Sequence, residues 1–520
     1  MRHQSGVEPR FARLGAAGHR GFAVCSNRET RWLSPRTTTT PPAEPRPKPS
    51  GHTSTLVATI EALTIGLDYE GGMIGRTKGH DILRFRAGTR RFVAFTNPDY
   101  VDHVLHAGRL KYHKSFEYEL LRALLGVSLF TDEDESWQRH RTMLTPMFAK
   151  RHLHGLIDLM IEPIEASVAR IDAQHGRVEV DMVGEMVELT LNVVGNALFG
   201  QQFGRIAVSM SHLVTDGLRF AERLERLFIV AAPPKRVWRA AAAVALTPIP
   251  LPPPFRRIQR VAQILDKEVW ALVNERRAHP TDSPDLLNHL LNASDEEGGL
   301  PVRRVRNEAL TFMLAGHETT ANALSWMWYL LALNPDVRTR LLDEVDTVLQ
   351  GRRPTAADLP RLPWTAACFQ EAMRYFSPAW AIPRVVIEDD VIDGHHIRKG
   401  TTVVIPTHHI HHDARWWPNP EEFDPARFLP GAGRDRARSA YLPFGGGKRI
   451  CIGSSFAVME SVLITAMMSQ KFVFDLVPGH PVAPEATLTL RPRDGLRMIA
   501  RRRVIPPVAD SVSADTEVRS

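Results

Sequence analysis

The sequence predicts a single domain that is mainly α-helical and carries small β-sheets. Apolar residues recur at helical spacing from about Leu120 to Leu349, in long amphipathic runs that proline clusters such as TPIPLPPPF (247–255) separate. Short strand-like runs occur on either side of this region, near residues 92–95 and again from Val385. Together these patterns predict one domain with more helix than strand.

The two ends of the chain differ from the rest in composition. Residues 1–50 contain eight Arg and one Lys against three Glu, and hold most of the proline-rich run TTTTPPAEPRPKPSG. Because this composition cannot bury enough apolar surface to order a chain, we expect residues 1–54 to form a disordered tail. An organelle transit peptide and a misassigned start codon are the alternatives. We expect the domain to span residues 55–506, and the polar residues 507–520 to be disordered.

Short strands are expected at three places. The apolar run from Phe92 to Phe95 breaks at Asn97-Pro98, which indicates a strand followed by a helix. The segment RVVIEDDVIDGHHIRKGTTVVIP (384–406) predicts two short strands around a turn at Gly394 and a third strand after Gly400. The segment ATLTLRPRDGLRMIA (486–500) is predicted to form a hairpin.

The composition limits the cellular compartment and the kinds of partner that we expect for this protein. Hydrophobic residues make up 43% and charged residues 24%, which is ordinary for a globular chain that buries a large core. The formal charge of +7 suits an acidic partner, but no lysine-rich block or aromatic-interleaved basic patch indicates nucleic acid. The cysteines Cys25, Cys368 and Cys451 are far apart and odd in number, so we expect a reducing compartment, the cytoplasm. The start of the chain contains no window of about 18 apolar residues. We therefore expect neither a membrane anchor nor a secretory signal there.

A glycine-rich loop places one cysteine beside two basic residues. The loop, FGGGKRICIG (444–453), precedes SSFAVMESVLITAMMSQKF (454–472), which has the pattern of a helix. A thiolate can ligate haem iron, glycines let backbone N–H groups approach its sulfur, and the helix dipole favours the anion. Arg449 is placed to pair with a haem propionate. The alternative is a buried structural cysteine beside a turn, the usual state of a lone cysteine.

This loop resembles the haem-binding loop of the cytochrome P450 family. The residues Phe444, Gly447, Arg449, Cys451 and Gly453 have the family's spacing. Further motifs in the family's order extend the resemblance over roughly residues 60–505, and the chain looks most similar to soluble bacterial members, actinobacterial ones in particular. The resemblance implies the mainly helical P450 fold, haem b as the cofactor with Phe444 and Arg449 beside it, and Cys451 as the ligand of its iron.

A second motif, AGHETT (315–320), lies in an apolar stretch that ends at Asn334-Pro335 and is typical of a buried core helix. Gly316 weakens this helix and leaves space beside its backbone, while a buried Glu318 is costly unless it is paired or used. From the residues alone, a core helix with a satisfied polar pair is the alternative. The resemblance implies that the helix opens over the haem for O2, and that Glu318 and Thr319 are catalytic residues that deliver protons.

A third motif, CFQEAMRYFSP (368–378), places Glu371 and Arg374 three residues apart on one helical face. Any helix can carry such a pair. The resemblance implies a structural role, in which the pair joins Arg427 and locks the cysteine loop. The family often has Glu where this chain has Ala426, a common departure.

Further basic residues match positions that bind the haem propionates in the family. In WQRHR (137–141), Trp137 and Arg141 are four apart and share a helical face. The alternative is a surface arginine over an aromatic ring. The resemblance implies that both residues contact the haem, as does Arg384 and, with weaker support, Lys114.

The stretch HHIHHD (408–413) looks like a metal site, but we do not expect one there. If the stretch is extended, alternate side chains point to opposite faces, so four ligands would not converge easily. The family has a histidine-rich segment at the same place.

The resemblance implies a monooxygenase that activates O2 and inserts one oxygen atom into a small apolar substrate, such as a lipid, fatty acid or sterol-like molecule. No flavin or iron–sulfur segment is visible, so electrons are expected from a separate ferredoxin or flavodoxin with its reductase. A haem-thiolate isomerase or peroxygenase and a non-catalytic haem-binding sensor are the alternatives. We expect the roof of the substrate pocket to be apolar and to include the following residues: Phe312, Ala315, Trp380, Ile382 and Leu490.

Overall fold

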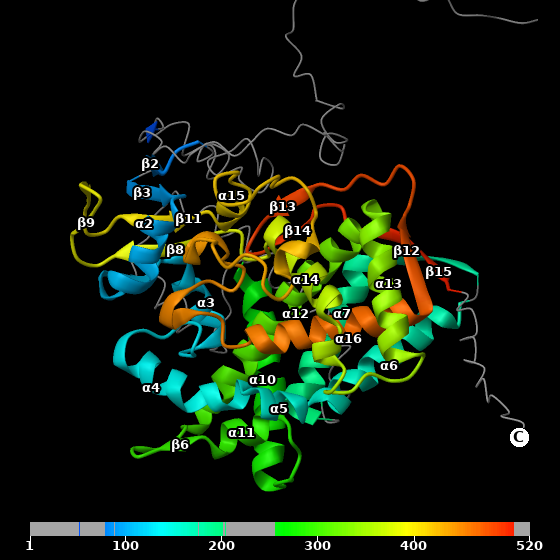
Figure 1. Cartoon of the computed structure of the whole chain (residues 1–520). Helices are drawn as coiled ribbons and strands as arrows, with labels where there is room; N and C mark the ends of the chain where they lie inside the picture. Colours follow the sequence, from blue (N-terminus) through cyan, green and yellow to red (C-terminus); the bar gives the residue numbers. More distant parts are fainter. Residues whose placement is uncertain are drawn as a thin grey trace, which may run out of the picture.

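The structure of the protein is a computed structural model, which describes residues 51–52, 79–87, 89–174, 176–200, 203 and 255–503. The expected disordered tails lie outside these residues, except that Gly51–His52 forms strand β1, parallel to β2 (Ile82–Ala87). Helices make up most of the described chain, and the large sheet lies at one side of them (Figure 1). The mainly α-helical single domain predicted from the sequence is confirmed.

None of the described helices combines the length and the apolar character needed to cross a membrane. In chain order the helices are α2 (Pro98–Asp102), α3 (Glu117–Leu125), α4 (Asp134–Leu144), α5 (Lys150–His154), α6 (Ile157–Asp172), α7 (Met182–Phe199), α10 (Phe255–Ala278), α11 (Leu286–Asn292), α12 (Val302–Leu333), α13 (Pro335–Leu349), α14 (Pro363–Tyr375), α15 (Thr407–His411) and α16 (Ser454–Lys471).

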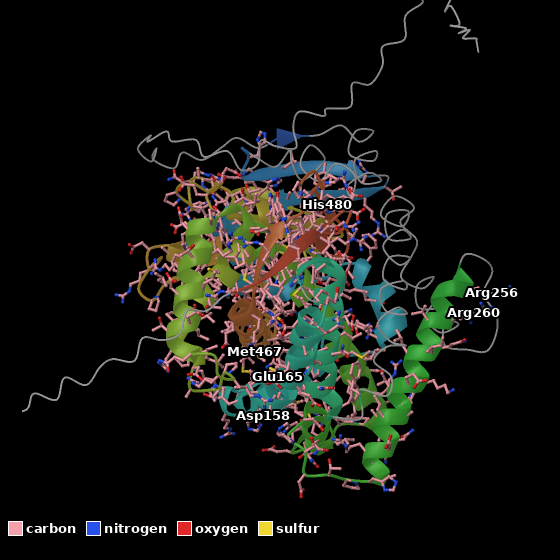
Figure 2. The ribbon with its side chains drawn as sticks, turned by 90° about the vertical axis from the view of Figure 1, so that its right-hand side faces the viewer. Asp158, Glu165, Arg256, Arg260, Met467 and His480 are labelled. Atoms are coloured by element: carbon pink, nitrogen blue, oxygen red, sulfur yellow. The ribbon has the colours of Figure 1, made fainter. Side chains whose placement is uncertain are left out.

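Helix α12 forms the centre of the helical region. Its side chains Leu324, Trp326 and Leu330 have no exposed surface, as expected for a helix that is apolar nearly all round. It packs against α7, α14 and α16 (Figure 1). Helix α16 in turn packs against α6, and Figure 2 shows Met467 of α16 in the same region as Asp158 and Glu165 of α6. The helix ends at Leu333 because Pro335 is the first residue of α13 and has no N–H to continue the ladder.

The large sheet has the strand order β1-β2-β3-β11-β8-β4. The turn at Gly394, where φ is +74°, joins a separate antiparallel pair, as the sequence predicts. Buried residues such as Phe95 and Val403 fill one face of the large sheet. The remaining strands of these two sheets are β3 (Arg90–Phe95), β4 (Tyr112–Lys114), β8 (Ile382–Val386), β11 (Thr402–Ile405), β9 (Asp390–Ile392) and β10 (His395–Ile397).

The predicted hairpin over residues 486–500 is wrong. Its two strands, β14 (Leu490–Pro492) and β15 (Arg497–Arg502), belong to different sheets. β15 is the middle strand of its sheet, so both of its edges are already paired, and β14 pairs with the preceding strand instead. Strand β15 pairs with β12 (Phe472–Leu476) and β5 (Arg177–Asp181), and β14 pairs with β13 (Pro484–Ala486). A further small pair is formed by β6 (Ser294–Asp295) and β7 (Gly298–Gly299).

Candidate active site

Cys451 lies between a tight glycine turn and the start of α16. Its backbone N–H donates a hydrogen bond to the Phe444 carbonyl (2.9 Å), which closes the loop. The side chain is exposed although protein atoms surround it, so it borders an internal space of the protein. Burial raises the pKa of the thiol, while the Gly453 backbone N–H and the Arg141 guanidinium oppose the rise. A further positive charge at the sulfur would therefore favour the thiolate.

Gly447 is required at its position by both conformation and space. Its φ is +68°, in the left-handed region that side-chain-bearing residues rarely adopt, and a Cβ there would lie 2.1 Å from the backbone oxygen of Leu105. The turn therefore brings the cysteine loop against the short helix His103–Ala107 with no room for a side chain. This close contact holds the loop in place from the side of the large sheet.

We expect Gly447→Ala to reduce haem retention and to lower the melting temperature of the protein. The matched control is Gly394→Ala, because Gly394 has a similar φ of +74° but open space around it. The control should show only the conformational strain, about 1–2 kcal/mol, whereas Gly447→Ala must also displace the Leu105 backbone. Thermal unfolding and haem content per chain measure both effects. Equal losses in the two variants would contradict the close contact with Leu105.

Three basic side chains gather near the cysteine loop. Arg384 is buried in β8, while Arg449 precedes Cys451 and Lys114 ends β4. Burial and the neighbouring Arg449 and Arg384 hold the pKa of Lys114 well below its ordinary value. Burial also lowers the pKa of Arg449, and Arg384 adds to that effect. Groups that depress one another's pKa in this way form a site that an anion would stabilise.

Helix α4 and the residue before it complete this basic cluster. The guanidinium of Arg449 lies over the Trp137 ring at 4.2 Å from its centroid, and it forms an ion pair with Glu133. Arg449 also donates to the Asp132 carbonyl (3.1 Å). Arg141, one turn after Trp137, is half-buried and close enough to Cys451 for their charges to interact. The structure thus brings Trp137 and Arg449 together and places Arg141 near Cys451, while the contact of these residues with haem stays a prediction.

A buried ionic network supports the segment that carries Glu133. Arg304 of α12 donates to Glu308 (2.6 Å) and to Asp132 (2.8 Å), and all three side chains are buried. Glu308 also accepts the Leu129 backbone N–H (2.8 Å). Because Asp132 immediately precedes Glu133, this network anchors the backbone that faces Arg449 to the central helix.

On α12, the residues of the AGHETT motif differ in exposure and in hydrogen-bond partners. Ala315 is exposed, whereas the neighbouring Leu314 is buried. The Thr319 hydroxyl donates to the Ala315 carbonyl (2.8 Å) and remains partly exposed. The Glu318 carboxylate does not bind Thr319 but accepts a hydrogen bond from Thr489 (2.9 Å), which in turn accepts from Asn322.

His317, between the matched motif positions, is a core residue. Its side chain is 1% exposed, and Nδ1 donates to the Met313 carbonyl (3.1 Å). Burial lowers the pKa of His317 to about 4, so the imidazole is neutral at pH 7. The residue fills the helix interface on the side away from Ala315, where the Thr190 hydroxyl bonds to its backbone carbonyl.

We expect His317 to make the protein less stable as the pH falls from its ordinary pKa of about 6.5 toward about 4. Below pH 6.5 the unfolded chain binds a proton on this residue, while the folded chain does not, so acid favours unfolding. The contribution lost between pH 7 and pH 5 is about 2 kcal/mol. Urea unfolding at the two pH values should show a smaller change for His317→Gln than for the unaltered protein. Equal changes would show that folding does not lower the pKa of His317.

The predicted structural cluster on α14 is confirmed. Arg374 and Glu371 form an ion pair at 2.7 Å with no exposed surface on either side chain, and Arg427 approaches Glu371 at 3.4 Å. Arg374 also donates to the carbonyls of His411 (2.9 Å) and Pro420 (2.8 Å). These bonds fasten α14 to the two segments that precede the cysteine loop.

The histidine-rich stretch is helical over α15, so the argument from an extended segment does not apply to it. His408 and His412 lie one turn apart with their ring centroids at 4.1 Å. His411 accepts the Leu442 backbone N–H (2.8 Å), which ties α15 to the residues just before Phe444. The side chains are therefore engaged in packing and in holding the loop.

The sequence interpretation missed three polar residues near these motifs. Glu133 and Thr489 carry no local signal, because their partners Arg449 and Glu318 are distant in the chain. Glu460 could have been noticed as a carboxyl within the apolar run 454–472. It has no exposed surface, and burial raises its pKa well above the ordinary value, with nearby Thr320 opposing the rise only in part. Burial therefore favours the neutral form of the Glu460 carboxyl group.

Four of the five residues expected in the apolar roof keep some exposed surface, and their place in a substrate pocket stays a prediction. Ala315 is exposed, Phe312 and Trp380 are partly buried, and Ile382 keeps 8% of its surface. Leu490, by contrast, has no exposed surface, so it borders no space that could hold a substrate. The reason is that its backbone bonds to Pro378 and to the Trp326 ring draw β14 against α12.

These residues fit haem b. The Cys451 thiol borders an internal space, and the basic cluster beside it suits two propionates. The fold and this site define a haem-thiolate protein of the monooxygenase class. The chain belongs to the cytochrome P450 family, whose model matches residues 75–498.

Relatives with known names agree with this assignment. A protein of Mycobacterium tuberculosis named cytochrome P450 132 is 56% identical over 88% of this chain and 97% of its own length. Cyclooctat-9-en-7-ol 5-monooxygenase of Streptomyces melanosporofaciens is 29% identical over 77% of this chain and 83% of its own length. The crystal structure of the cytochrome P450DA haem domain matches with a TM-score of 0.71 at 26% identity, covering 84% of this chain and 92% of that domain. The predicted family, its actinobacterial likeness and the haem b cofactor are therefore confirmed.

Proposed function

We propose that Cys451 holds the haem iron and that the enzyme inserts oxygen into a small apolar substrate with electrons from a separate protein. The observation that carries this proposal is the position of the thiol, at the start of α16 and bordering an internal space. Bound haem would supply a redox-active iron whose thiolate ligand favours cleavage of the O–O bond of O2. Everything else in the reaction depends on how this chain orients its ligands and moves protons.

The basic cluster is proposed to hold the haem propionates. Arg449, Arg384 and Lys114 place three cationic groups together, and Glu133 is the carboxylate that pairs with Arg449. Two propionates would balance the remaining charge, while the Trp137 ring beneath Arg449 restricts the orientation of its guanidinium. Arg141 lies closer to the sulfur and supports its negative charge.

Thr319 and Glu318 are proposed to carry protons into the site. The Thr319 hydroxyl is partly exposed and can exchange its bond to the Ala315 carbonyl for a bond to a water molecule or to O2. The Glu318 carboxylate accepts a hydrogen bond from Thr489 and is adjacent to Thr319 in the sequence. Both residues are therefore proposed as members of one proton relay.

We expect Thr319→Ala to separate electron consumption from product formation. Proton delivery of this kind contributes roughly 10²–10⁴-fold to the rate at most. Haem binding should persist, because Thr319 is not among the residues proposed to hold the haem. Product formed per electron should fall, and hydrogen peroxide should be released. The matched control is Thr320→Ala, because Thr320 is buried and its hydroxyl bonds to the Gly316 carbonyl. The yields of product and of hydrogen peroxide per reducing equivalent measure whether Thr319 couples electron consumption to product formation. Unchanged coupling in Thr319→Ala, or equal loss in both variants, would remove Thr319 from the proton path.

The electron donor is proposed to be an acidic ferredoxin or flavodoxin with its reductase, acting in the cytoplasm. The net charge of +7 favours association with an acidic partner. Turnover with a surrogate ferredoxin system should require O2 and weaken as salt rises. Turnover that needs only a peroxide would instead indicate a peroxygenase or isomerase, and carbon monoxide binding without turnover of any lipid or sterol would indicate a sensor.

A further inference from the structure

A second basic site lies on the large sheet, on strands that contribute none of the residues of the haem site proposed above. Arg84 and Arg86 alternate along β2 and so point to the same face, and Arg91 of β3 lies directly opposite Arg86 in the strand register. Like charges in directly opposed positions destabilise an antiparallel pair. The arrangement therefore reduces the stability of this hairpin unless an anion lies between the guanidinium groups.

These arginines form one wall of a groove. Strand β10 and the residues that follow it form the other wall. His396 and Arg398 are exposed on that side, and the volume between the walls is about 350 Å³. Arg91 donates to the Lys399 carbonyl (3.0 Å), which holds the two walls together. We call this feature the basic groove. Its floor is formed by the buried side chains of Val93 and Ile397, while Phe85 and Phe92, whose side chains point to the other face of the sheet, line it with their backbone.

The basic groove differs from other arginine-rich sheet surfaces in this protein. On the sheet formed by β12, β15 and β5, exposed Arg497 pairs with Glu179 and Arg501 pairs with Asp475, each at 2.5 Å. Within the described part of the chain, Arg84, Arg86 and Arg398 have no carboxylate within ion-pair distance. The residues that line the groove include no acidic side chain. The charge of the groove is therefore not balanced by the described protein.

We infer that the basic groove binds the phosphate group of an organic molecule with an apolar part. Guanidinium groups bind phosphate through paired N–H donors, and the negative charge of a phosphate group would offset the repulsion between Arg86 and Arg91. The groove is several times larger than a phosphate ion, and its apolar floor suits a hydrocarbon portion. A phospholipid head group and a free phosphorylated metabolite share this chemistry.

The test compares two triple variants of the haem-loaded protein that lose the same charge. The first, R84Q/R86Q/R398Q, empties the groove of three arginines. The control, R260Q/R277Q/R434Q, removes three exposed arginines elsewhere, of which Arg260 lies on α10 at the edge of the molecule in Figure 2. The probes are phosphatidylglycerol vesicles, with phosphatidylcholine vesicles as the neutral reference, and glycerol 3-phosphate measured by calorimetry.

We expect the unaltered protein to bind at least one of the two phosphate probes. The groove variant should bind it on the order of 100-fold more weakly, since each arginine near an anionic surface contributes about a factor of five. The control should lose less than about threefold, because distant charges are screened. Binding to vesicles alone identifies a lipid head group, and binding of glycerol 3-phosphate identifies a soluble ligand. Equal losses in both variants, or no binding of either phosphate probe, would overturn the inference.

Discussion

Cys451→Ser is expected to abolish the red-shifted Soret band that reduced haem-thiolate proteins show with carbon monoxide, and to abolish monooxygenation. A serine oxygen at this position cannot replace the thiolate that the iron requires. The protein should still fold, because the loop is closed by backbone groups and by Gly447 rather than by the sulfur. The reduced difference spectrum and the product yield provide the measurement.

The other cysteines serve as controls. Cys368 has no exposed surface, and burial raises the pKa of its thiol well above the ordinary value, which disfavours the thiolate. Cys368→Ala should keep the band, and so should Cys25→Ser, which lies outside the described residues. Persistence of the band in Cys451→Ser would mean that another residue ligates the iron.

Arg374→Ala is expected to prevent the protein from accumulating in a folded, haem-loaded form. The substitution leaves the Glu371 carboxylate buried without its main partner and removes donors from the carbonyls of His411, Pro420 and Glu422. Breaking a buried pair in this way costs about 3–5 kcal/mol, against about 5–15 kcal/mol for the stability of a typical domain. Soluble yield, melting temperature and haem per chain should all fall.

Two variants make this prediction specific to the buried pair. Arg374→Lys keeps the charge but loses the forked geometry, so its effect should be intermediate. Arg353→Ala removes one partner of an exposed ion pair with Glu165, the residue labelled on α6 in Figure 2, and should change little because such pairs are solvated. If Arg374→Ala melts within a few degrees of the unaltered protein, the cluster does not hold the cysteine loop in place.

The features that the sequence alone could predict are those decided by neighbouring residues. The end of α12 follows from Pro335, and the turn at Gly394 from its permissive backbone. The helix after Gly453 and the shared face of Glu371 and Arg374 follow from short-range spacing. In the same way the residues of the cysteine loop, read by their spacing, were sufficient for the family, the fold and the cofactor.

What only the tertiary structure decided are the pairings between distant segments. β15 lies between two other strands and so leaves β14 to a different partner, although their sequence is typical of a hairpin. Glu318 binds Thr489 rather than the adjacent Thr319, and Arg449 is held by Glu133 and Trp137 from a segment more than 300 residues earlier. Local propensity cannot determine these contacts, because their free energy exists only once packing has desolvated both partners and brought them into reach.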